Sequence, residues 1–361
     1  MLVLFRSSLN VLVTGVGSPA ALGVIRSLRR VPDCRFHITG VDVNPNAIGA
    51  VWCDGFCVVP RPDEPAFPEI ITKLCRAHSI DVILSLVTKE LEVLAALQPT
   101  LACFGTHLAL STRESLRAAN HKGALLHLLR QRGVEVPEFS TVKSASELQE
   151  AVNVLSHGGK PVCCKPIYGD GGRGFHIIAT RPDEARRLFE EKPDSTYISK
   201  SELLRIAQEA NRIPELIVME YLPGDEYSVD ALAKHGETVV AIPRLREQIV
   251  SGITTKGVIV NHRDVTAYVK HVVAALGLHG NVGVQVRRNA EGNVRILEVN
   301  PRLQGTTVHC TAAGVNLPWL GVKLALLESI SEEELQVHYG TRMMRHWSEV
   351  FFADEGKPYT L

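Results

Sequence analysis

The sequence lacks the features that would place a chain in a membrane or outside the cell. No apolar run approaches the about 20 residues that a membrane span needs. The apolar start, residues 1–10, is short and has no small-residue cleavage site of a secretory signal, so we expect a cytoplasmic protein. The 39 basic residues (Lys and Arg) balance the 39 acidic ones, so the charge does not indicate a nucleic-acid or membrane partner.

The eight cysteines fit neither of two common structural uses of cysteine. A disulfide framework is typical of short secreted chains, and this chain has 361 residues. Cys53 and Cys57 have no second Cys/His pair at the spacing of a zinc site. We therefore expect reduced thiols, most of them packed in the core.

The first third of the chain alternates between strand-like and helix-like segments. Apolar runs predict strands at residues 10–17, 35–42, 56–59, 81–87 and 102–105. Helical periodicity predicts helices at residues 19–30, 65–78 and 89–97. Strands separated by helices indicate an α/β unit, with a parallel sheet that is covered on both faces.

The rest of the chain has a different pattern and no internal repeat. Capping boxes from Ser111 to Glu114 and from Ser144 to Glu147 predict two helix starts. Further helices are predicted at residues 121–132 and 265–276, and strands at residues 160–166, 175–180, 217–220, 227–233, 238–246, 281–288 and 294–299. This spacing indicates an α+β region with a largely antiparallel sheet, and we place boundaries near residues 110 and 195.

A glycine turn joins the first strand to the first helix. Gly15 and Gly17 fit the first two positions of a dinucleotide-binding fingerprint, but the third glycine is displaced to Gly23. Asp42 ends the second strand, where such a fold would hold ribose. The pattern is compatible with a nicotinamide cofactor, a purely structural turn, or a carboxylate substrate at the helix end.

A second glycine-dense segment, residues 165–174, follows a strand and leads into another strand. Lys165 supplies a point charge for a phosphate. The glycines, Gly169 to Gly174, leave backbone N–H groups free of side chains that would block phosphate oxygens, as in a mobile flap. A flexible hairpin tip is the alternative interpretation.

Two further segments carry acidic and amide side chains at the ends of apolar strands. In residues 217–230, Glu220 and Glu226 flank a turn, which is typical of a nucleotide pocket and also of an ordinary strand–turn–strand. Glu298 and Asn300 are two residues apart on one predicted strand, and Gln285 lies on its hairpin partner. These oxygen groups suit Mg²⁺, and Arg302 can bind a carboxylate or phosphate through two nitrogens. The alternative interpretation is that they are ordinary polar side chains at an exposed strand edge.

These motifs resemble the ATP-grasp superfamily. The likeness is to the ATP-binding halves of the carbamoyl phosphate synthetase large subunit and to small stand-alone relatives such as the pyrrolysine-biosynthesis ligase. It extends over residues 10–350 and includes the run from Glu298 to Thr307 (EVNPRLQGTT). It implies an ATP-grasp fold with a Rossmann-like pre-domain (residues 1–110), a small lid subdomain (111–195) and an antiparallel-sheet catalytic subdomain (196–361).

The resemblance also implies roles for individual residues. The ATP contacts would be Lys122 and Lys165 on phosphates, the flap glycines Gly169, Gly171, Gly172 and Gly174, Glu220 and Leu222 at the adenine hinge, Glu226 on ribose, and Lys256 in the loop 251–257. Two Mg²⁺ ions, which Mn²⁺ could replace, would be held by Gln285, Glu298 and Asn300. The substrates would be held by Arg302, Arg244 and Arg246, with Thr88 and Glu90 bordering the acceptor pocket; Arg302 and Lys165 would be catalytic.

The implied activity is ATP-dependent ligation of a small-molecule carboxylate to an amine through an acyl phosphate, with release of ADP and phosphate, on amino-acid-like substrates. A phosphotransferase without amine ligation, a regulator without turnover and a nicotinamide oxidoreductase stay open. One ATP-grasp unit without a glutaminase-like segment makes carbamoyl phosphate synthesis an unexpected activity. A homodimer is expected from the superfamily, His309 and Cys310 are expected to pack, and residues 338–361 are expected to form a strand or an interface.

Overall fold

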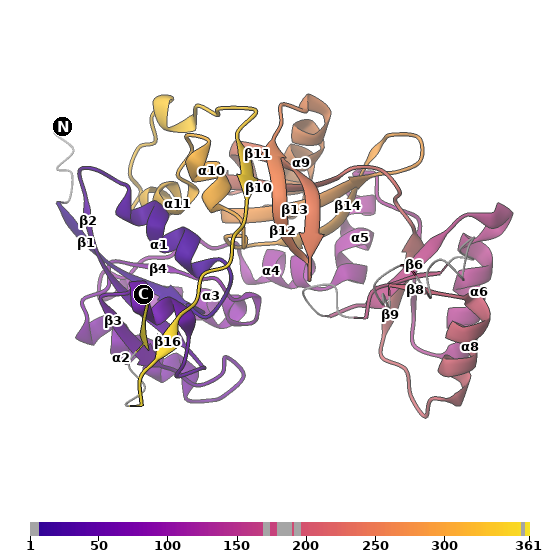
Figure 1. Ribbon diagram of the computed structural model, residues 1–361, viewed down its shortest axis with the longest axis horizontal. Helices are drawn as coiled ribbons and strands as arrows, with labels where there is room; N and C mark the ends of the chain where they lie inside the picture. The colour runs from indigo at the N-terminus through magenta and orange to yellow at the C-terminus, as the bar shows by residue number, and fades with distance from the viewer. Residues whose placement is uncertain (1–6, 169–173, 179–189, 191–195, 355–357) are drawn as a thin grey trace. The chain divides into compact units, whose positions relative to one another are not determined.

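The computed structural model describes residues 7–168, 174–178, 190, 196–354 and 358–361 (Figure 1). The chain divides into two compact units. Unit 1 comprises residues 1–120, 226–286 and 297–361, and unit 2 comprises residues 121–225 and 287–296. Each unit therefore draws on segments that are far apart in the sequence.

The N-terminal part of unit 1 is a parallel sheet of four strands in the order β3-β2-β1-β4 (Figure 1). The strands are β1 (Ser8–Thr14), β2 (Arg35–Asp42), β3 (Gly55–Val58) and β4 (Val82–Leu84). This confirms the predicted parallel sheet. The predicted strand at residues 102–105 is wrong, because helix α3 (Leu91–Ala102) keeps its buried face as far as Leu101 and residues 103–105 form a turn at its end.

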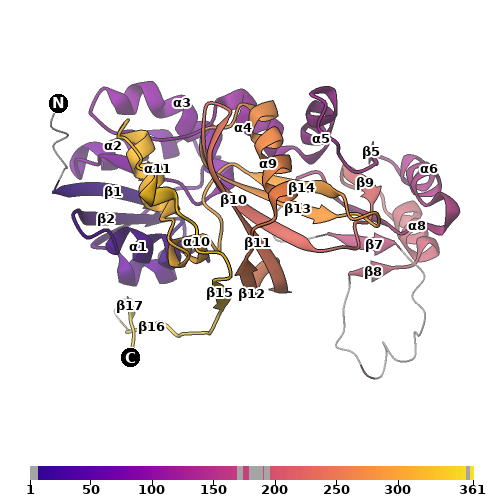
Figure 2. The same cartoon turned by 90° about the horizontal axis from the view of Figure 1, so that it is seen from above.

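Helices cover both faces of this sheet, as expected. On one face α2 (Phe67–Ala77) and α3 share a core in which Ile71 and Leu94 pack with Ile83. On the other face α1 (Ala21–Arg29) is joined by two helices from far along the chain, α10 (Val308–Ala312) and α11 (Leu317–Ala325) (Figure 2). Helices from the C-terminal part of the chain thus help to cover one face of the N-terminal sheet.

The second sheet of unit 1 has six strands in the order β14-β13-β10-β11-β12-β15. They are β10 (Glu226–Lys234), β11 (Glu237–Val250), β12 (Ile253–Ile259), β13 (Gly280–Arg288), β14 (Val294–Asn300) and β15 (Arg342–Met344). The pairs β10–β11, β11–β12 and β12–β15 are antiparallel, as predicted. Helix α9 (Arg263–Leu276) packs on this sheet, and helix α4 (Arg113–Asn120) packs against α9 and α3.

Two local predictions in this region are wrong. The predicted loop 251–257 is a two-residue turn, Ser251 (φ 50°) and Gly252 (φ 77°), after which β12 begins. Two successive positive φ values match the right-handed twist of the flanking strands, so the hairpin closes tightly. Helix α4 is capped by Thr112, whose Oγ1 accepts from the Ser115 N–H (3.2 Å), rather than by Ser111.

Unit 2 is built on a five-stranded sheet in the order β5-β9-β6-β7-β8. Its elements are α5 (Lys122–Gln131), β5 (Phe139–Val142), α6 (Ala145–Leu155), β6 (Val162–Pro166), β7 (His176–Ile178), β8 (Tyr197–Ile198), α8 (Lys200–Glu209) and β9 (Leu216–Glu220). Helices α6 and α8 share a core with the sheet. The capping box at Ser144 is confirmed, since its Oγ accepts from the Glu147 N–H (3.3 Å).

Short elements complete the chain. They are the 3₁₀ helices η1 (Ile48–Trp52), η2 (Thr88–Glu90), η3 (His157–Gly159) and η4 (Glu333–Leu335), and the strand pair β16 (Phe351–Phe352) and β17 (Pro358–Tyr359). All eight cysteines are free thiols, as expected. Within the ranges that the structure describes, no helix has the length and apolar character to cross a bilayer.

Two glycines with similar backbone angles should differ sharply in their tolerance of a side chain. Gly280 has φ +87°, and a Cβ there would lie 2.0 Å from the Ala109 carbonyl oxygen; Gly292 has φ +83° and open space around it. Gly292→Ala should cost about 1–2 kcal/mol of backbone strain alone. Gly280→Ala should cost about 3 kcal/mol or more, because the overlap adds to the strain.

The thermal unfolding midpoints of the two purified variants measure this difference. A clearly lower midpoint for Gly280→Ala than for Gly292→Ala is expected. Equal midpoints would show that the close contact between Gly280 and Ala109 does not constrain the fold.

Candidate functional site

The predicted oxygen ligands at the end of β14 point together. The Asn300 side-chain N–H donates to Glu298 Oε1 over 2.9 Å. Residues two apart on a strand share one face, so the contact follows from the extended backbone. Asn300 is buried and Glu298 is half-buried.

Gln285, on the adjacent strand β13, is brought to the same place by an arginine. Its Oε1 accepts from Arg246 Nη1 (3.2 Å), and the same nitrogen donates to Glu226 Oε1. Burial lowers the pKa of Arg246, and the nearby Glu226 and Glu298 carboxylates oppose that effect. Gln285 and Glu226 therefore meet at one nitrogen of the Arg246 guanidinium, and the Glu298 carboxylate lies near the same group.

The chemistry of this donor set fits Mg²⁺. One carboxylate (Glu298) and two amide oxygens (Gln285 and Asn300) are hard oxygen ligands, and Mg²⁺ completes its octahedral shell with water and phosphate oxygens. No group of three or more His, Cys, Asp or Glu side chains that could hold a metal occurs among the described residues. The amide groups are therefore essential to the proposed set.

Arg302 connects the end of β14 to the end of β4. Its Nε donates to Thr88 Oγ1 (2.9 Å), Nη1 donates to the Leu303 carbonyl oxygen (2.9 Å), and Nη2 donates to Asn300 Oδ1 (3.3 Å). Three contacts from three different nitrogens fix the plane of the guanidinium. A planar fork held in this way can receive a carboxylate or phosphate in a defined orientation.

Glu90 lies at the point of the parallel sheet where the strand order reverses, between β1 and β4. Ligands of open α/β sheets bind at such points, beyond the carboxyl ends of the strands. Glu90 is 3% exposed, and its Oε1 accepts from Thr14 Oγ1 and Ser85 Oγ, the latter over 2.6 Å. Burial raises the pKa of Glu90 to about 7, so its charge changes near neutral pH.

The glycine turn after β1 is occupied by internal contacts. The Gly17 N–H donates to Asp42 Oδ2 (2.7 Å), and the Asn44 N–H donates to Asp42 Oδ1 (2.9 Å). A Cβ at Gly15 would lie 2.3 Å from a methyl group of Val87. These contacts favour the structural interpretation of the turn over a dinucleotide site.

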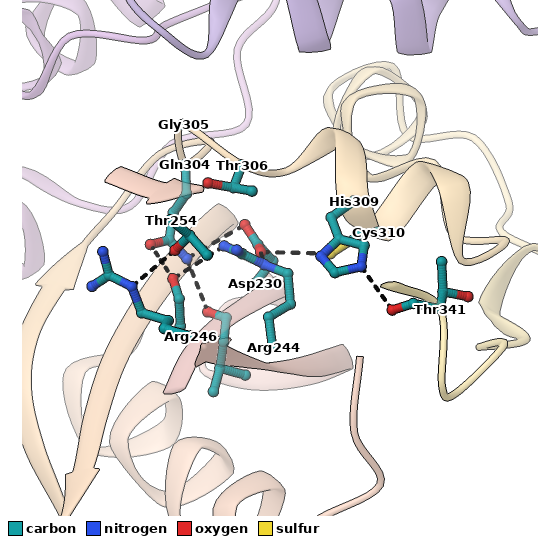
Figure 3. A network of polar contacts seen from close by, with 12 residues as sticks. Asp230, Arg244, Arg246, Thr254, Gln304, Gly305, Thr306, His309, Cys310 and Thr341 are labelled. Atoms are coloured by element: carbon teal, nitrogen blue, oxygen red, sulfur yellow. Dashed lines mark hydrogen bonds and ion pairs between the residues drawn. The ribbon is translucent and has the colours of Figure 1, made fainter. Parts of the chain in front are cut away.

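Arg244 is buried below the loop that follows β14 (Figure 3). Its Nε donates to Asp230 Oδ2 (2.5 Å) and its Nη2 donates to Ser228 Oγ (3.0 Å). Gln304 joins the pair, since its Oε1 accepts from Ser228 Oγ (2.8 Å) and its Nε2 donates to Asp230 Oδ1 (3.4 Å). The role of Arg244 as a substrate anchor stays a prediction, and its observed contacts support the loop.

The same loop is held from the C-terminal stretch by Arg345. Its Nη2 donates to the Gly305 carbonyl oxygen and to Thr306 Oγ1 (3.4 Å), and its Nε donates to the Thr254 carbonyl oxygen (3.1 Å). The sequence analysis gave no role to Arg345 or Gln304, although Gln304 lies in the run from Glu298 to Thr307. Arg345 reaches the loop because strand β15 pairs with β12 and brings the C-terminal stretch there.

His309 and Cys310 are buried in α10, as expected for packing residues. One ring nitrogen of His309, Nε2, lies 2.9 Å from the Thr341 carbonyl oxygen (Figure 3). The Cys310 thiol lies 3.5 Å from Asp230 Oδ2, and burial raises the pKa of this thiol well above its usual value. A thiol held in its protonated form beside a carboxylate is not an activated nucleophile.

In unit 2, two predicted lysines lie near the start of the glycine-dense segment. Lys165 is on β6, and Lys122 Nζ donates to the Ile167 carbonyl oxygen (3.3 Å). Gly174 has φ +69°, and a Cβ there would lie 2.8 Å from Pro166. The other predicted flap glycines, Gly169, Gly171 and Gly172, lie outside the described residues.

The remaining predicted nucleotide contacts are on separate elements. In unit 2, Glu220 Oε2 accepts from the Glu138 N–H (3.0 Å), and Leu222 is buried. In unit 1, Lys256 is on β12, and its Nζ lies 3.9 Å from Glu247 Oε2. Their roles in nucleotide binding stay predictions.

Two family models match parts of the chain. The model described as "ATP-grasp in the biosynthetic pathway with Ter operon" matches residues 212–347, and the model described as "PylC-like, N-terminal domain" matches residues 11–109. Among curated proteins, the carbamoyl phosphate synthase large chain of Gemmatimonas aurantiaca is 25% identical over 63% of this chain. That of Methanobrevibacter smithii is 23% identical over 74% of this chain. The matches span 20% and 25% of those two proteins.

Solved structures with the same fold include several enzymes. Carboxyaminoimidazole ribonucleotide synthase from Aspergillus clavatus, complexed with ATP, has a TM-score of 0.67 at 16% identity, covering 92% of this chain and 80% of that one. L-amino acid ligase from Bacillus licheniformis has a TM-score of 0.64 at 14% identity, covering 92% and 78%. The biotin carboxylase domain of Hydrogenobacter thermophilus 2-oxoglutarate carboxylase, complexed with MgADP and bicarbonate, has a TM-score of 0.64 at 16% identity, covering 91% and 72%.

The raised pKa of Glu90 predicts a pH dependence of stability. Between the unfolded value of about 4.3 and the folded value of about 7, the folded chain holds a proton that the unfolded chain has released. This stabilisation is complete below the unfolded pKa and is lost as the pH rises through 7. Relative to Glu90→Gln, the wild type should therefore lose up to about 3 kcal/mol of unfolding free energy between pH 5 and pH 8.5.

Denaturant unfolding at these two pH values checks this expectation. Glu92→Gln, which removes an acid that pairs with Arg117 on the outside of the same unit, serves as the control and should follow the wild type. Parallel pH profiles for wild type and Glu90→Gln would show that Glu90 is ionised in the folded chain.

Proposed function

We propose that this chain, which has the fold of ATP-grasp enzymes, is an ATP-dependent ligase that joins a small-molecule carboxylate to an amine, releasing ADP and phosphate. The observation that carries the proposal is the cluster at the end of β14. There Asn300 donates to Glu298, and Gln285 accepts from the Arg246 guanidinium. Arg302 donates to Asn300 and to Thr88. Metal-type oxygens and an oriented arginine in one place suit transfer of a phosphoryl group to a carboxylate.

In the proposed reaction, the substrate carboxylate attacks the γ-phosphorus of ATP. The bond from that phosphorus to the β,γ-bridging oxygen breaks, and ADP leaves. The amine then attacks the acyl carbon of the acyl phosphate, phosphate leaves, and the nitrogen loses a proton. Arg302 holds the carboxylate through the first step and the acyl phosphate through the second, so that the carboxyl group keeps one position while its oxygen attacks phosphorus and while the amine attacks its carbon.

Magnesium ions would be held by Gln285, Glu298 and Asn300 and would neutralise the phosphate charge that the reaction redistributes. Two ions, with Mn²⁺ as a substitute, are the proposed complement. Lys122, Lys165, Glu220, Leu222, Glu226 and Lys256 are proposed to contact the nucleotide. Lys165, which ends strand β6 before the glycine-dense segment, is the proposed catalytic cation for the phosphates.

Amino-acid-like molecules are the proposed substrates. A structural relative is an L-amino acid ligase, which supports this class. Arg302 suits a substrate carboxylate, and Glu90, at the reversal point of the parallel sheet, suits an amino group when it is ionised. Arg244 and Arg246 are the other proposed substrate contacts, and a homodimer in the cytoplasm is the proposed state of the protein.

A screen of ADP release tests the proposal. Purified protein with Mg²⁺ and ATP is offered single amino acids and pairs of them. A ligase should release ADP at a rate that rises when a second, amine-bearing substrate is added, with a new C–N-linked product by mass spectrometry. ADP release that needs no amine would instead indicate a phosphotransferase.

Removing the predicted metal carboxylate should abolish turnover without unfolding the chain. Glu298→Gln is expected to lower kcat by about 100-fold or more, because a first ligand contributes at least as much as the groups that merely orient ligands. The control is Glu237→Gln at the exposed start of β11. Wild-type turnover by Glu298→Gln would contradict the assignment of this site.

A further inference from the structure

Arg246 uses all three guanidinium nitrogens at the centre of the candidate site. Nε donates to Thr254 Oγ1 (2.9 Å), and Nη2 donates to the Gly252 carbonyl oxygen (2.6 Å). Nη1 donates to both Glu226 Oε1 and Gln285 Oε1. The side chain is 5% exposed, so its charge is held in a fixed position with little screening by water.

The turn after β11 explains why this position is fixed. Ser251 and Gly252 form a tight two-residue turn, and the Gly252 carbonyl oxygen is directed at the guanidinium. Thr254, at the start of β12, accepts a hydrogen bond from Arg246 Nε. The arginine is therefore oriented by the hairpin itself, independently of the acidic and amide groups that it meets on its other edge.

A cation bound to Gln285 must approach an oxygen that already accepts from a cationic group. Mg²⁺ or Mn²⁺ coordinates oxygen at about 2.0–2.2 Å, so the bound ion would lie within a few ångströms of Arg246 Nη1. Like charges at such a distance in a poorly screened site repel strongly. The two can share this place only if the arginine shifts or the metal is bound weakly.

We propose that Arg246 is the residue that sets the divalent-metal affinity of the site, by acting as a resident counter-cation for Glu226 and Glu298 while it donates to Gln285. This proposal rests on the metal site of the proposed function. Because the arginine offsets part of the negative charge of the two carboxylates, the protein alone holds a divalent ion weakly. The metal then arrives effectively as a complex with nucleotide phosphates, which supply the missing negative charge.

The neighbouring arginines do not share this arrangement. Arg244 is paired with Asp230 and is buried below the loop. Arg302 also donates to a proposed metal ligand, Asn300 Oδ1 (3.3 Å), but through Nη2, while its Nε donates to Thr88 Oγ1. Arg246 bridges a carboxylate and a proposed metal ligand through a single nitrogen.

Manganese binding to the full-length protein without nucleotide tests the proposal. Free Mn²⁺ is counted by electron paramagnetic resonance during a titration. Arg246→Gln removes the resident positive charge, and it should tighten Mn²⁺ binding by about tenfold or more. The matched control is Arg342→Gln, which removes an exposed arginine from β15 of the same sheet and should bind Mn²⁺ as the wild type does.

Two outcomes overturn the proposal: unchanged Mn²⁺ affinity in Arg246→Gln, or weaker affinity, which would assign the arginine to the positioning of Gln285. If Arg246→Gln does not fold, Arg246→Lys decides. A lysine ammonium cannot span Glu226, Thr254 and Gly252 at once, so it should tighten binding by a smaller factor, and no tightening would overturn the idea.

Glu298→Gln separates this inference from the proposed function. If Glu298→Gln binds Mn²⁺ as tightly as the wild type, the metal site itself is misassigned. If Glu298→Gln loses Mn²⁺ binding while the Arg246 variants match the wild type, the metal site stands and only the counter-cation role fails.

Discussion

A buried ion pair governs the geometry of the candidate site. Asp230 and Arg244 are both almost inaccessible, and two buried charges need good mutual geometry and further hydrogen bonds. Ser228 and Gln304 supply hydrogen bonds to the pair, while Arg244 Nη1 has no hydrogen-bond partner among the described residues. Gln304 can reach the pair because β13 has Gly283 at the crossing point, where a Cβ would lie 2.1 Å from the Gln304 side chain.

The direction of the loop after β14 follows from that constraint. With Gln304 directed into the sheet, Arg302, two residues earlier, lies beside Thr88, and the Gly305 carbonyl oxygen meets Arg345. The loop is therefore held from the sheet below, from the parallel sheet at Thr88 and from the C-terminal stretch. Three independent attachments keep an arginine with several rotatable bonds in one orientation, which the proposed two-step reaction of one carboxyl group requires.

The two sheets of unit 1 share a single core. Residues of β1 such as Val11 and Val13, residues of β10 and β11 such as Leu232 and Ile242, and helices α10 and α11 belong to one cluster. Since protein interiors are close-packed, the end of β4 and the end of β14 cannot move independently. The contact between Arg302 and Thr88 thus depends on packing at a distance from both residues.

Local sequence patterns determined the elements and the chemical nature of the site. The alternation of strands and helices predicted the parallel sheet, the spacing of Glu298 and Asn300 predicted their contact, and the capping box at Ser144 predicted a helix start. Each depends on neighbours within a few residues, where backbone geometry alone sets which side chains meet. The end of α3 and the turn at Ser251 were mispredicted, because short apolar or polar runs there fit more than one local structure.

Only the tertiary structure decided which distant groups complete the site. Arg345 reaches the loop after β14 because β15 joins the edge of the second sheet, and Gln304 enters the core because a glycine lies opposite it. Arg246 meets Gln285 and Glu226 because three strands are neighbours in the sheet. Strand order and the packing of long polar side chains arise from many weak contacts across the whole unit, and no short stretch of sequence encodes them.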